Sequence, residues 1–320
     1  MTTNDPATLR SYTLTDKGAV PEGQNWWTTS LVPALGYSQP NGLALTPDDR
    51  HLVVAVANGA AVFTVRKQSL LAPSLTLDGV LPSTGGQPLE VAVSGDGRFV
   101  FLSDHGSDEL VVFNLQRALT SGFGQKDVVG TVSLGTLPGG MSLSPNGRRL
   151  YVVSERASVD STYGTLTTLS VSELEKRPAQ SVVSTVDSGC GSVRVEATSS
   201  TVYVTARDAN SLLSFSASAL VDNPRHALVG TLNVETGPIG LGLVDHQKGL
   251  VIADSRGDAL AVLALDRPGD PTILGYMKSG EYPRELAVSP NGLWVLVSAW
   301  ESDQIQVVPV EALLTAWPHL

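Results

Sequence analysis

The sequence predicts an all-β fold, a single β-propeller domain of four-stranded blades over residues 1–320. The first observation is a ten-residue signature, written PRELAVSPNG at residues 283–292, which recurs six times. The copies begin at Pro40, Pro88, Pro138, Ser192, Pro238 and Pro283, at intervals of 48, 50, 54, 46 and 45 residues. The second observation is that short β-branched or aromatic runs, separated by turn residues, follow every copy. Repeats of about 40–50 residues with four short strands each are typical of propeller blades.

Each repeat is expected to supply its four strands in the same order. The signature gives a short first strand, such as residues 43–45, and then a turn of Pro, Asp, Asn or Gly. These residues allow the fixed or positive φ angles that tight turns need. Second strands are expected at 52–56, 99–103, 150–154, 202–206, 250–254 and 294–298. Third strands are expected at 61–65, 110–115, 165–171, 212–215, 260–265 and 305–310, and looser fourth strands at 128–134, 228–234 and 272–277.

The six signatures favour six blades, and seven would need a degenerate unit shared between the two termini. Residues 9–14 and 26–32 have the pattern of a third and a fourth strand, whereas the last repeat ends after its third strand. We therefore expect the ring to be closed by pairing N-terminal with C-terminal strands, because such closure removes free sheet edges.

Composition narrows the classes of function. The net charge of −10 disfavours nucleic acid as a partner. No apolar run is long enough to cross a bilayer and no apolar leader is present, so we expect a soluble, cytoplasmic protein without membrane contact. The single Cys190 rules out an intrachain disulfide. Five histidines without ligand spacing, and no phosphate-binding glycine loop, predict that neither a metal nor a cofactor is bound. Oligomeric state is left open.

Alternate residues of the first strands are expected to face the central channel. The second position reads Gly42, Glu90, Gly140, Arg194, Gly240 and Glu285, and the fourth reads Ala44, Ala92, Ser142, Glu196, Gly242 and Ala287. Small residues are the rule, and the charged exceptions are Glu90, Arg194, Glu196 and Glu285. Charges in a narrow channel must be paired, hydrated or bound to a ligand. Two interpretations follow: a hydrated channel in which Arg194 bridges two carboxylates, or the floor of a substrate pocket.

Two families of loops are expected to meet at one rim of the channel. Antiparallel alternation brings the loops between second and third strands to the same end as the connections from fourth to first strands. The expected catalytic residues are Arg194, Glu90, Glu285 and His105. The expected substrate-binding residues are Arg284, Arg207, Asp104, Glu155, Arg156, Asp254, Arg256, Trp300, Tyr37, Tyr282 and Asn58. Each alone could equally be a solvated loop residue, but a cluster of this kind is the default site hypothesis.

The signatures, with LYVVS at 150–154 and VYVTAR at 202–207, resemble the YVTN-repeat, lactonase-like β-propellers over nearly the whole chain. Residues 190–256 are most similar to fungal members. The group includes sugar-lactone hydrolases and muconate-lactonising enzymes, and fungal propellers of broadly this kind are linked to cyclisations such as hetero-Diels–Alder reactions. In the 6-phosphogluconolactonase-like branch, Arg and His or Glu at the channel mouth are the suspected working residues. Arg194, Arg284, Glu90 and His105 are their counterparts, but the chain lacks a clear seventh signature.

Two functions are compatible with these features. The first is a metal-independent, non-redox enzyme acting on a small oxygenated organic molecule, by lactone hydrolysis or isomerisation or by a hetero-Diels–Alder-type cyclisation. Arginines would polarise a carbonyl oxygen, Glu90, Glu285 or His105 would move a proton, and Trp300 with two tyrosines would hold a ring. The second is a non-catalytic scaffold that presents its rim to a protein partner, because propellers serve both roles.

Overall fold

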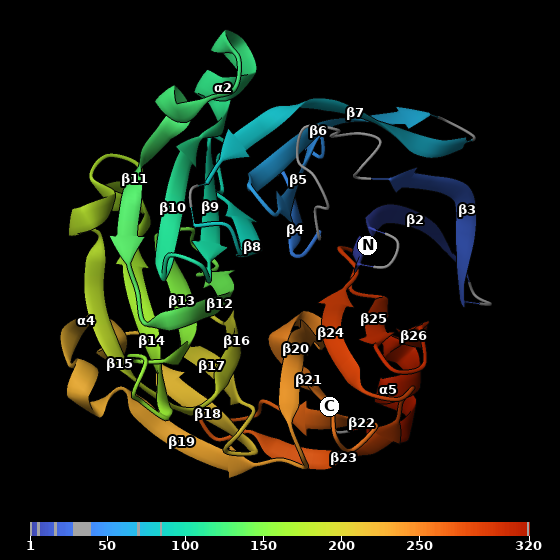
Figure 1. Ribbon diagram of the computed structural model, residues 1–320. Helices are drawn as coiled ribbons and strands as arrows, with labels where there is room; N and C mark the ends of the chain where they lie inside the picture. Colours follow the sequence, from blue (N-terminus) through green and yellow to red (C-terminus); the bar gives the residue numbers. More distant parts are fainter. Residues whose placement is uncertain are drawn as a thin grey trace.

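The protein is a β-propeller, and six sheets stand around a central axis in the computed structural model (Figure 1). The structure describes residues 2–4, 7–15, 18–27, 40–68, 71–83, 85–318 and 320. Within each sheet the strands follow one another in sequence order, so the first strand of every repeat is the innermost. The predicted fold class is therefore confirmed.

Five ring sheets have four strands and one has three. We name each blade after its inner strand. The β4 and β8 blades comprise β4 (Leu43–Leu45), β5 (His51–Val56), β6 (Gly59–Gln68), β7 (Leu71–Pro82), β8 (Pro88–Val93), β9 (Phe99–Asp104), β10 (Glu109–Asn114) and β11 (Val128–Ser133). The β12 and β16 blades comprise β12 (Thr136–Leu143), β13 (Arg149–Arg156), β14 (Tyr163–Ser170), β15 (Val182–Cys190), β16 (Ser192–Ala197), β17 (Thr201–Ala206), β18 (Ser211–Ser216) and β19 (Leu228–Asn233). The β20 and β24 blades comprise β20 (Pro238–Val244), β21 (Gly249–Asp254), β22 (Ala259–Ala264), β23 (Thr272–Lys278), β24 (Pro283–Val288), β25 (Trp294–Ala299) and β26 (Gln304–Pro309).

The N-terminal strands do not complete the last blade as expected. Strands β1 (Thr2–Asn4), β2 (Ala7–Thr15) and β3 (Gly18–Trp27) pair with one another in a separate sheet. Strand β3 lies beside both β7 and β26, so this sheet stands between the first and last ring blades (Figure 1). The expected strand at 9–14 lies within β2, whereas the expected strand at 26–32 overlaps the end of β3 and otherwise lies outside the described residues. Among the described residues, the termini close the ring by packing sheets side by side rather than by sharing one.

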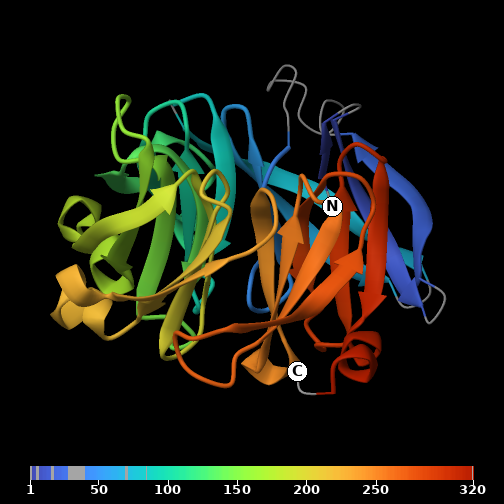
Figure 2. The ribbon, with the colours of Figure 1, turned by 90° about the horizontal axis from the view of Figure 1, so that it is seen from below.

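Short helices lie outside the sheets. Among the described residues, four are α-helical: α2 (Leu115–Ser121), α3 (Val171–Leu174), α4 (Ala219–Asp222) and α5 (Val310–Ala316). Four more in the same part of the chain are single 3₁₀ turns: η2 (Gln125–Asp127), η3 (Pro178–Gln180), η4 (Pro224–His226) and η5 (Asp245–Gln247). Helices α2, α3 and α4 each follow a third strand, and Figure 2 shows α4 and α5 projecting from the body of the propeller. Within the described part of the chain, no helix has the length and apolar character needed to cross a membrane.

The core is divided into layers between neighbouring blades. Each layer joins the second and third strands of one blade to those of the next, as in the cluster of Val153, Leu166, Val204 and Phe215. The third-position residues of the inner strands, such as Val91 and Val195, are buried in these layers as expected. In β4, however, Leu43 and Leu45 are 39% and 49% exposed, and among the described strands only β5 and β8 pack closely against β4.

Candidate functional site

A bulge in the inner strands turns the second residue of the signature toward the channel. The register between inner and second strands shifts at this point in the β8, β12, β16, β20 and β24 blades. Such a bulge re-aims a side chain and leaves a backbone group to be satisfied. Hydroxyl groups of the second strands accept hydrogen bonds from these backbone amides. The Glu90 amide donates to Ser103 Oγ at 3.1 Å, and the Glu285 amide donates to Ser298 Oγ at 3.0 Å.

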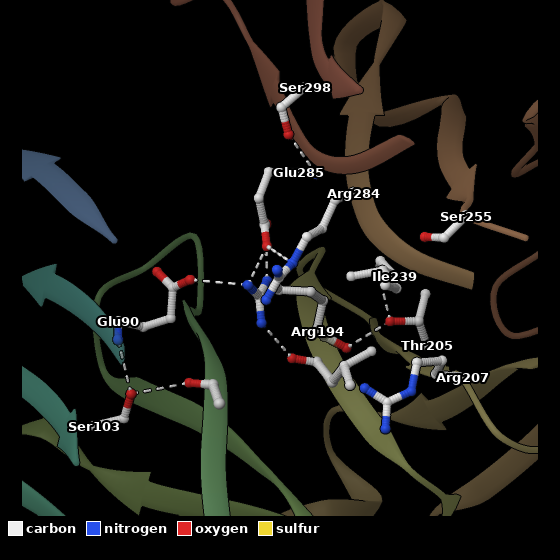
Figure 3. Close-up of polar contacts among 12 residues, drawn as sticks. Glu90, Ser103, Arg194, Thr205, Arg207, Ile239, Ser255, Arg284, Glu285 and Ser298 are labelled. Carbon is white, nitrogen blue, oxygen red and sulfur yellow. Dashed lines mark hydrogen bonds and ion pairs between the residues drawn. The ribbon is translucent and has the colours of Figure 1, made fainter. Parts of the chain in front are cut away.

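Three hydroxyls near the ends of second strands donate to the inner strand of the next blade. Ser103 Oγ donates to the Gly139 carbonyl at 3.1 Å, and Thr205 Oγ1 donates to the Ile239 carbonyl at 2.7 Å (Figure 3). Ser255 Oγ, one residue beyond β21, donates to the carbonyl of Pro283 at 2.6 Å. Sequence reasoning missed these residues, although a Ser or Thr at 103, 154, 205 and 298, near the end of four second strands, was a visible signal.

At the second position of the signature, glycines alternate with charged residues around the ring, and packing between neighbouring inner strands explains this. A Cβ on Gly42 would lie 2.8 Å from the Glu90 Cα, and one on Gly140 would lie 2.8 Å from the Arg194 Cα. A Cβ on Gly240 would lie 2.6 Å from the carbonyl oxygen of Arg284. Each of these distances is shorter than a van der Waals contact. The glycines are therefore small because the next inner strand, carrying the charged residue, lies against them.

The charged residues of three alternate blades meet at the axis. Arg194 from β16 donates through Nε to Glu285 Oε2 at 3.0 Å and through Nη2 to Glu285 Oε1. Its Nη2 also lies 3.1 Å from Glu90 Oε1, and its Nη1 donates to the Val193 carbonyl at 2.9 Å. Figure 3 shows the Glu90 and Glu285 carboxylates reaching this guanidinium from two different directions. Arg194 thus bridges two carboxylates, as one of the two interpretations expected.

The bridge does not fill the channel, because a cavity of about 290 Å³ adjoins it. The cavity is lined by second- and third-position residues of all six inner strands, together with Glu196: Leu43, Glu90, Val91, Gly140, Met141, Arg194, Val195, Glu196, Gly240, Leu241, Glu285 and Leu286. The two interpretations are therefore compatible, since the ion pairs form part of the wall of a pocket.

Burial changes the acid–base properties of this wall. Removal from water raises the pKa of Glu90 to about 7, and the repulsion of Glu285 adds to this while the positive charge of Arg194 opposes it. Burial alone would lower the pKa of Arg194, but Glu285 and Glu90 hold it above its ordinary value, so the guanidinium stays charged. Glu196 lies deeper on β16, accepts from Ser142 Oγ at 3.3 Å, and has its pKa raised to about 7 by burial.

A second group of charges surrounds Arg207 at the rim. Arg207 Nη2 lies 3.2 Å from Glu155 Oε2, and Arg207 Nε lies 3.1 Å from Asp208 Oδ1. Arg256 Nη2 lies 3.7 Å from the same Asp208 oxygen, and Arg156 is exposed nearby. In Figure 3 no interaction joins Arg207 to the Arg194 cluster. We call Arg207, Glu155, Asp208 and Arg256 the rim network.

Arg284 and Trp300 form a third feature at the mouth. The Arg284 guanidinium carbon lies 5.1 Å from the centre of a Trp300 ring, and Trp300 is 54% exposed. Arg284 Nε is also 3.9 Å from Glu285 Oε1, which connects the mouth to the inner cluster. Tyr282 adopts a positive φ of 53°, and its amide donates to Asp258 Oδ1 at 2.8 Å. Arg284 and Trp300 are therefore brought together, as expected.

Two expected binding residues are buried within the loops instead of lining the rim. Asp104 is fully buried, and its carboxylate accepts hydrogen bonds from the Gly106 amide at 2.9 Å and the Gln87 amide at 3.2 Å. Asp254 is also fully buried, and burial raises its pKa to about 7. Both end a second strand, but only Asp104 binds the loops from inside, since neither carboxylate oxygen of Asp254 has a hydrogen-bond partner among the described residues. Asn58 is exposed at the equivalent turn of the β4 blade, and Tyr37 lies outside the described residues.

His105 is half-buried beside the channel mouth. Burial lowers its pKa, the charge of Glu155 raises it, and the charge of Arg194 lowers it. Its Nε2 atom is buried and has no hydrogen-bond partner among the described residues. The imidazole is therefore held neutral at pH 7, with one nitrogen unused. In the described part of the chain, no three His, Cys, Asp or Glu side chains gather in a way that could hold a metal ion.

Comparison with known proteins gives a family and a fold. A family model described as lactonase, seven-bladed β-propeller, matches residues 29–313. No curated protein matches the chain. Among solved structures, the chain is similar to the periplasmic gluconolactonase PpgL of Pseudomonas aeruginosa, with 19% identity, a TM-score of 0.70, and coverage of 94% of this chain and 87% of that one.

A protein of Bacteroides fragilis, named provisionally as a 6-phosphogluconolactonase, is similar at 13% identity, a TM-score of 0.71, and coverage of 95% and 86%. A Bacteroides uniformis protein with the same provisional name shares 16% identity, a TM-score of 0.71, and coverage of 95% and 87%. At these identities the structures support the fold alone. The family model spans most of the sequence, including every residue of the Arg194 cluster, and the chain therefore belongs to the lactonase family of seven-bladed β-propellers.

Proposed function

We propose that this protein is a metal-independent, non-redox enzyme that hydrolyses or isomerises a lactone in the central cavity. The observation that carries the proposal is the joint presence, in one cavity wall, of a clamped guanidinium and a carboxyl group that titrates near neutral pH. The gluconolactonase name of the P. aeruginosa structure, and the family description, support the same class of substrate.

Arg194 would act on the carbonyl oxygen of the lactone. Its Nε donates to Glu285, and its Nη2 is shared between Glu285 and Glu90. One N–H of Nη1 donates to the Val193 carbonyl. The other N–H of Nη1 has no partner among the described residues, so it is the donor left for a ligand. A guanidinium fixed by its own ion pairs needs no reorganisation when negative charge develops on the oxygen.

Glu90 would act as the general base. A base is most effective when its pKa is close to the working pH, and burial brings Glu90 to about 7. The ionised carboxylate takes a proton from a water molecule, and the oxygen of that water attacks the carbonyl carbon. The ring carbon–oxygen bond then breaks, and Glu90 returns the proton to the alcohol oxygen that leaves. Isomerisation would use the same carboxylate to move a proton between carbon atoms.

The cyclisation that the sequence left open has less support. A cycloaddition needs chiefly an apolar pocket that holds the reactants together. This cavity is walled by three carboxylates and a guanidinium. A scaffold function remains the alternative from another class, and the following experiment separates it from the enzyme.

The test is acid release from a panel of five- and six-membered lactones, followed by pH-stat. We expect turnover of at least one lactone, and a fall in kcat of about 100-fold or more in Glu90→Gln. Glu281→Gln, an exposed residue outside the cavity lining, is the matched control and should keep full activity. Failure to hydrolyse any lactone, or full activity in a folded Glu90→Gln protein, would overturn the proposal.

A further inference from the structure

We propose that the cavity selects ligands that carry a protonated amine and discriminates against anionic ligands, with Glu196 as the residue that determines this specificity. The inference rests on the proposed function only in calling the ligand a substrate. It is carried by the charges of the wall, by the hydrogen-bonding state of Arg194 and by the position of Glu196.

The wall holds more negative than positive groups. Glu90, Glu196 and Glu285 line the cavity, and Arg194 is the cation among the residues that line it. Arg284 is close to Glu285, but it lies at the mouth and stacks on Trp300. An anionic ligand would therefore enter a site whose own carboxylates repel it. The formal charge of −10 on the whole chain acts in the same direction by attracting cations.

Arg194 cannot easily serve an anionic group. Two of its nitrogens face Glu285 as a fork, and Nη2 is shared with Glu90. Its side chain is only 14% exposed. Among the described residues only one N–H of Nη1 is left without a partner, so a carboxylate or phosphate could grip the guanidinium with two oxygens only by displacing Glu285 or Glu90. Displacing a carboxylate from an arginine that is only 14% exposed is unfavourable, because the guanidinium loses a charged partner where water replaces it poorly.

Glu196 is the carboxylate that lacks a cation. It forms no ion pair with any described residue, and its side-chain hydrogen bond is to Ser142, at 3.3 Å. It follows Arg194 by two residues on β16, so both side chains lie on the same face, with backbone positions about 7 Å apart. A ligand that meets the N–H of Arg194 at one end could thus place a donor on Glu196 at the other. Burial raises the pKa of Glu196 to about 7, so a cation would favour its ionised form at neutral pH.

The rest of the wall sets the size and shape of the ligand. Met141, Leu241 and Leu286 contribute apolar surface between the charged residues. A volume of about 290 Å³ accommodates one substituted ring rather than an extended chain. The ligand class is therefore a small oxygen-containing ring that bears a primary or secondary ammonium group.

Three unreactive six-membered ring ethers provide matched probes: 4-aminotetrahydropyran, 4-hydroxytetrahydropyran and tetrahydropyran-4-carboxylate. Binding is measured by calorimetry at pH 7.5 for the whole protein, so no turnover is needed. We expect the amine to bind about ten-fold more tightly than the alcohol, and the carboxylate to bind more weakly than both. In Glu196→Gln the advantage of the amine should disappear while binding of the alcohol stays within about two-fold. Glu281→Gln should behave as the unaltered protein.

Equal binding of the amine and the alcohol, tighter binding of the carboxylate, or an amine preference that survives Glu196→Gln would overturn the inference. Circular dichroism of the variant excludes misfolding as the cause, and Glu196→Asp is a second variant that keeps the charge and should keep part of the preference. The two proposals fail separately. Lactone turnover without amine preference contradicts only the specificity, and amine binding without lactone turnover contradicts only the reaction.

Discussion

Two arginine–carboxylate networks lie at the same end of the β16 blade, and they differ in the exposure of the arginine and in the pKa of a carboxyl group. The inner cluster joins Arg194 to Glu90 and Glu285 across three blades, with Arg194 14% exposed. In the rim network, Arg207 is 26% exposed, and its partner Asp208 has its pKa held below the ordinary value, chiefly by the hydrogen bond from Arg207. In the inner cluster, burial raises the pKa of Glu90 more than the charge of Arg194 lowers it, and the resulting pKa is about 7. The same residue types thus give a reactive carboxyl group only where water is excluded.

The largest expected difference between the networks comes from removing each arginine. Arg194→Met leaves Glu90 and Glu285 in the channel without their cation, and we expect a loss of about 3–5 kcal/mol in the free energy of unfolding. Arg207→Met should cost no more than about 1 kcal/mol, because Asp208 is 46% exposed and keeps Arg256 Nη2 at 3.7 Å as a second cation. Urea denaturation measures both. Equal costs would show that the inner cluster is not energetically distinct.

The pH dependence of stability sharpens the comparison. The pKa of Glu196 rises from 4.5 to about 7 on folding, so between these values the folded state keeps a proton that the unfolded chain releases. The contribution of Glu196 to stability therefore falls as the pH rises from about 4.5 to 7. Glu196→Gln should be more stable than the unaltered protein by about 1–3 kcal/mol at pH 8, and indistinguishable at pH 4. Thermal unfolding at both pH values checks this, and a constant difference would contradict it.

The packing of glycine against the charged strands can be tested in the same way. Gly140→Ala places a methyl group 2.8 Å from the Arg194 Cα, so the two inner strands must separate. We expect a loss of about 1–3 kcal/mol in unfolding free energy, together with reduced activity. Gly95→Ala is the control, because a Cβ there meets nothing within 4 Å. Equal stability of the two variants would contradict the packing explanation.

The smallest expected effect is at the mouth. Trp300→Ala removes the ring on which Arg284 stacks, and an exposed interaction of this kind is worth about 0.5–1 kcal/mol. We expect KM to rise by about two- to five-fold with kcat unchanged. A large fall in kcat would instead place Trp300 in contact with the reacting atoms.

The sequence predicted much of the fold and part of the site. Repetition of the signature indicated the blades, and reading its copies in register brought Glu90, Arg194 and Glu285 to one channel. The glycine spacing could not be explained from the sequence, because Gly140 is small owing to a strand 54 residues later. The hydroxyls of Ser103 and Thr205 were missed for the same reason, since their acceptors belong to the next blade.

The burial of individual loop residues also could not be predicted from the sequence. Asp104 and Asp254 follow the same pattern as exposed rim residues, yet both are fully buried. Among the described residues, the N-terminal strands pair with one another in the β1–β3 sheet, and the sequence did not predict this choice of partner. The positions of strands could be predicted from residue patterns, whereas the pairing of one strand with another depends on segments that are distant in the sequence.

The pH dependence of kcat/KM for lactone hydrolysis tests the central claim most directly. With Glu90 as a base whose pKa is about 7, kcat/KM should rise as the pH increases through 7 and then level off. Glu90→Gln should lose both the rate and this rise, whereas Glu281→Gln, at an exposed residue outside the cavity lining, should keep both. A folded Glu90→Gln protein with an unchanged profile would contradict the account.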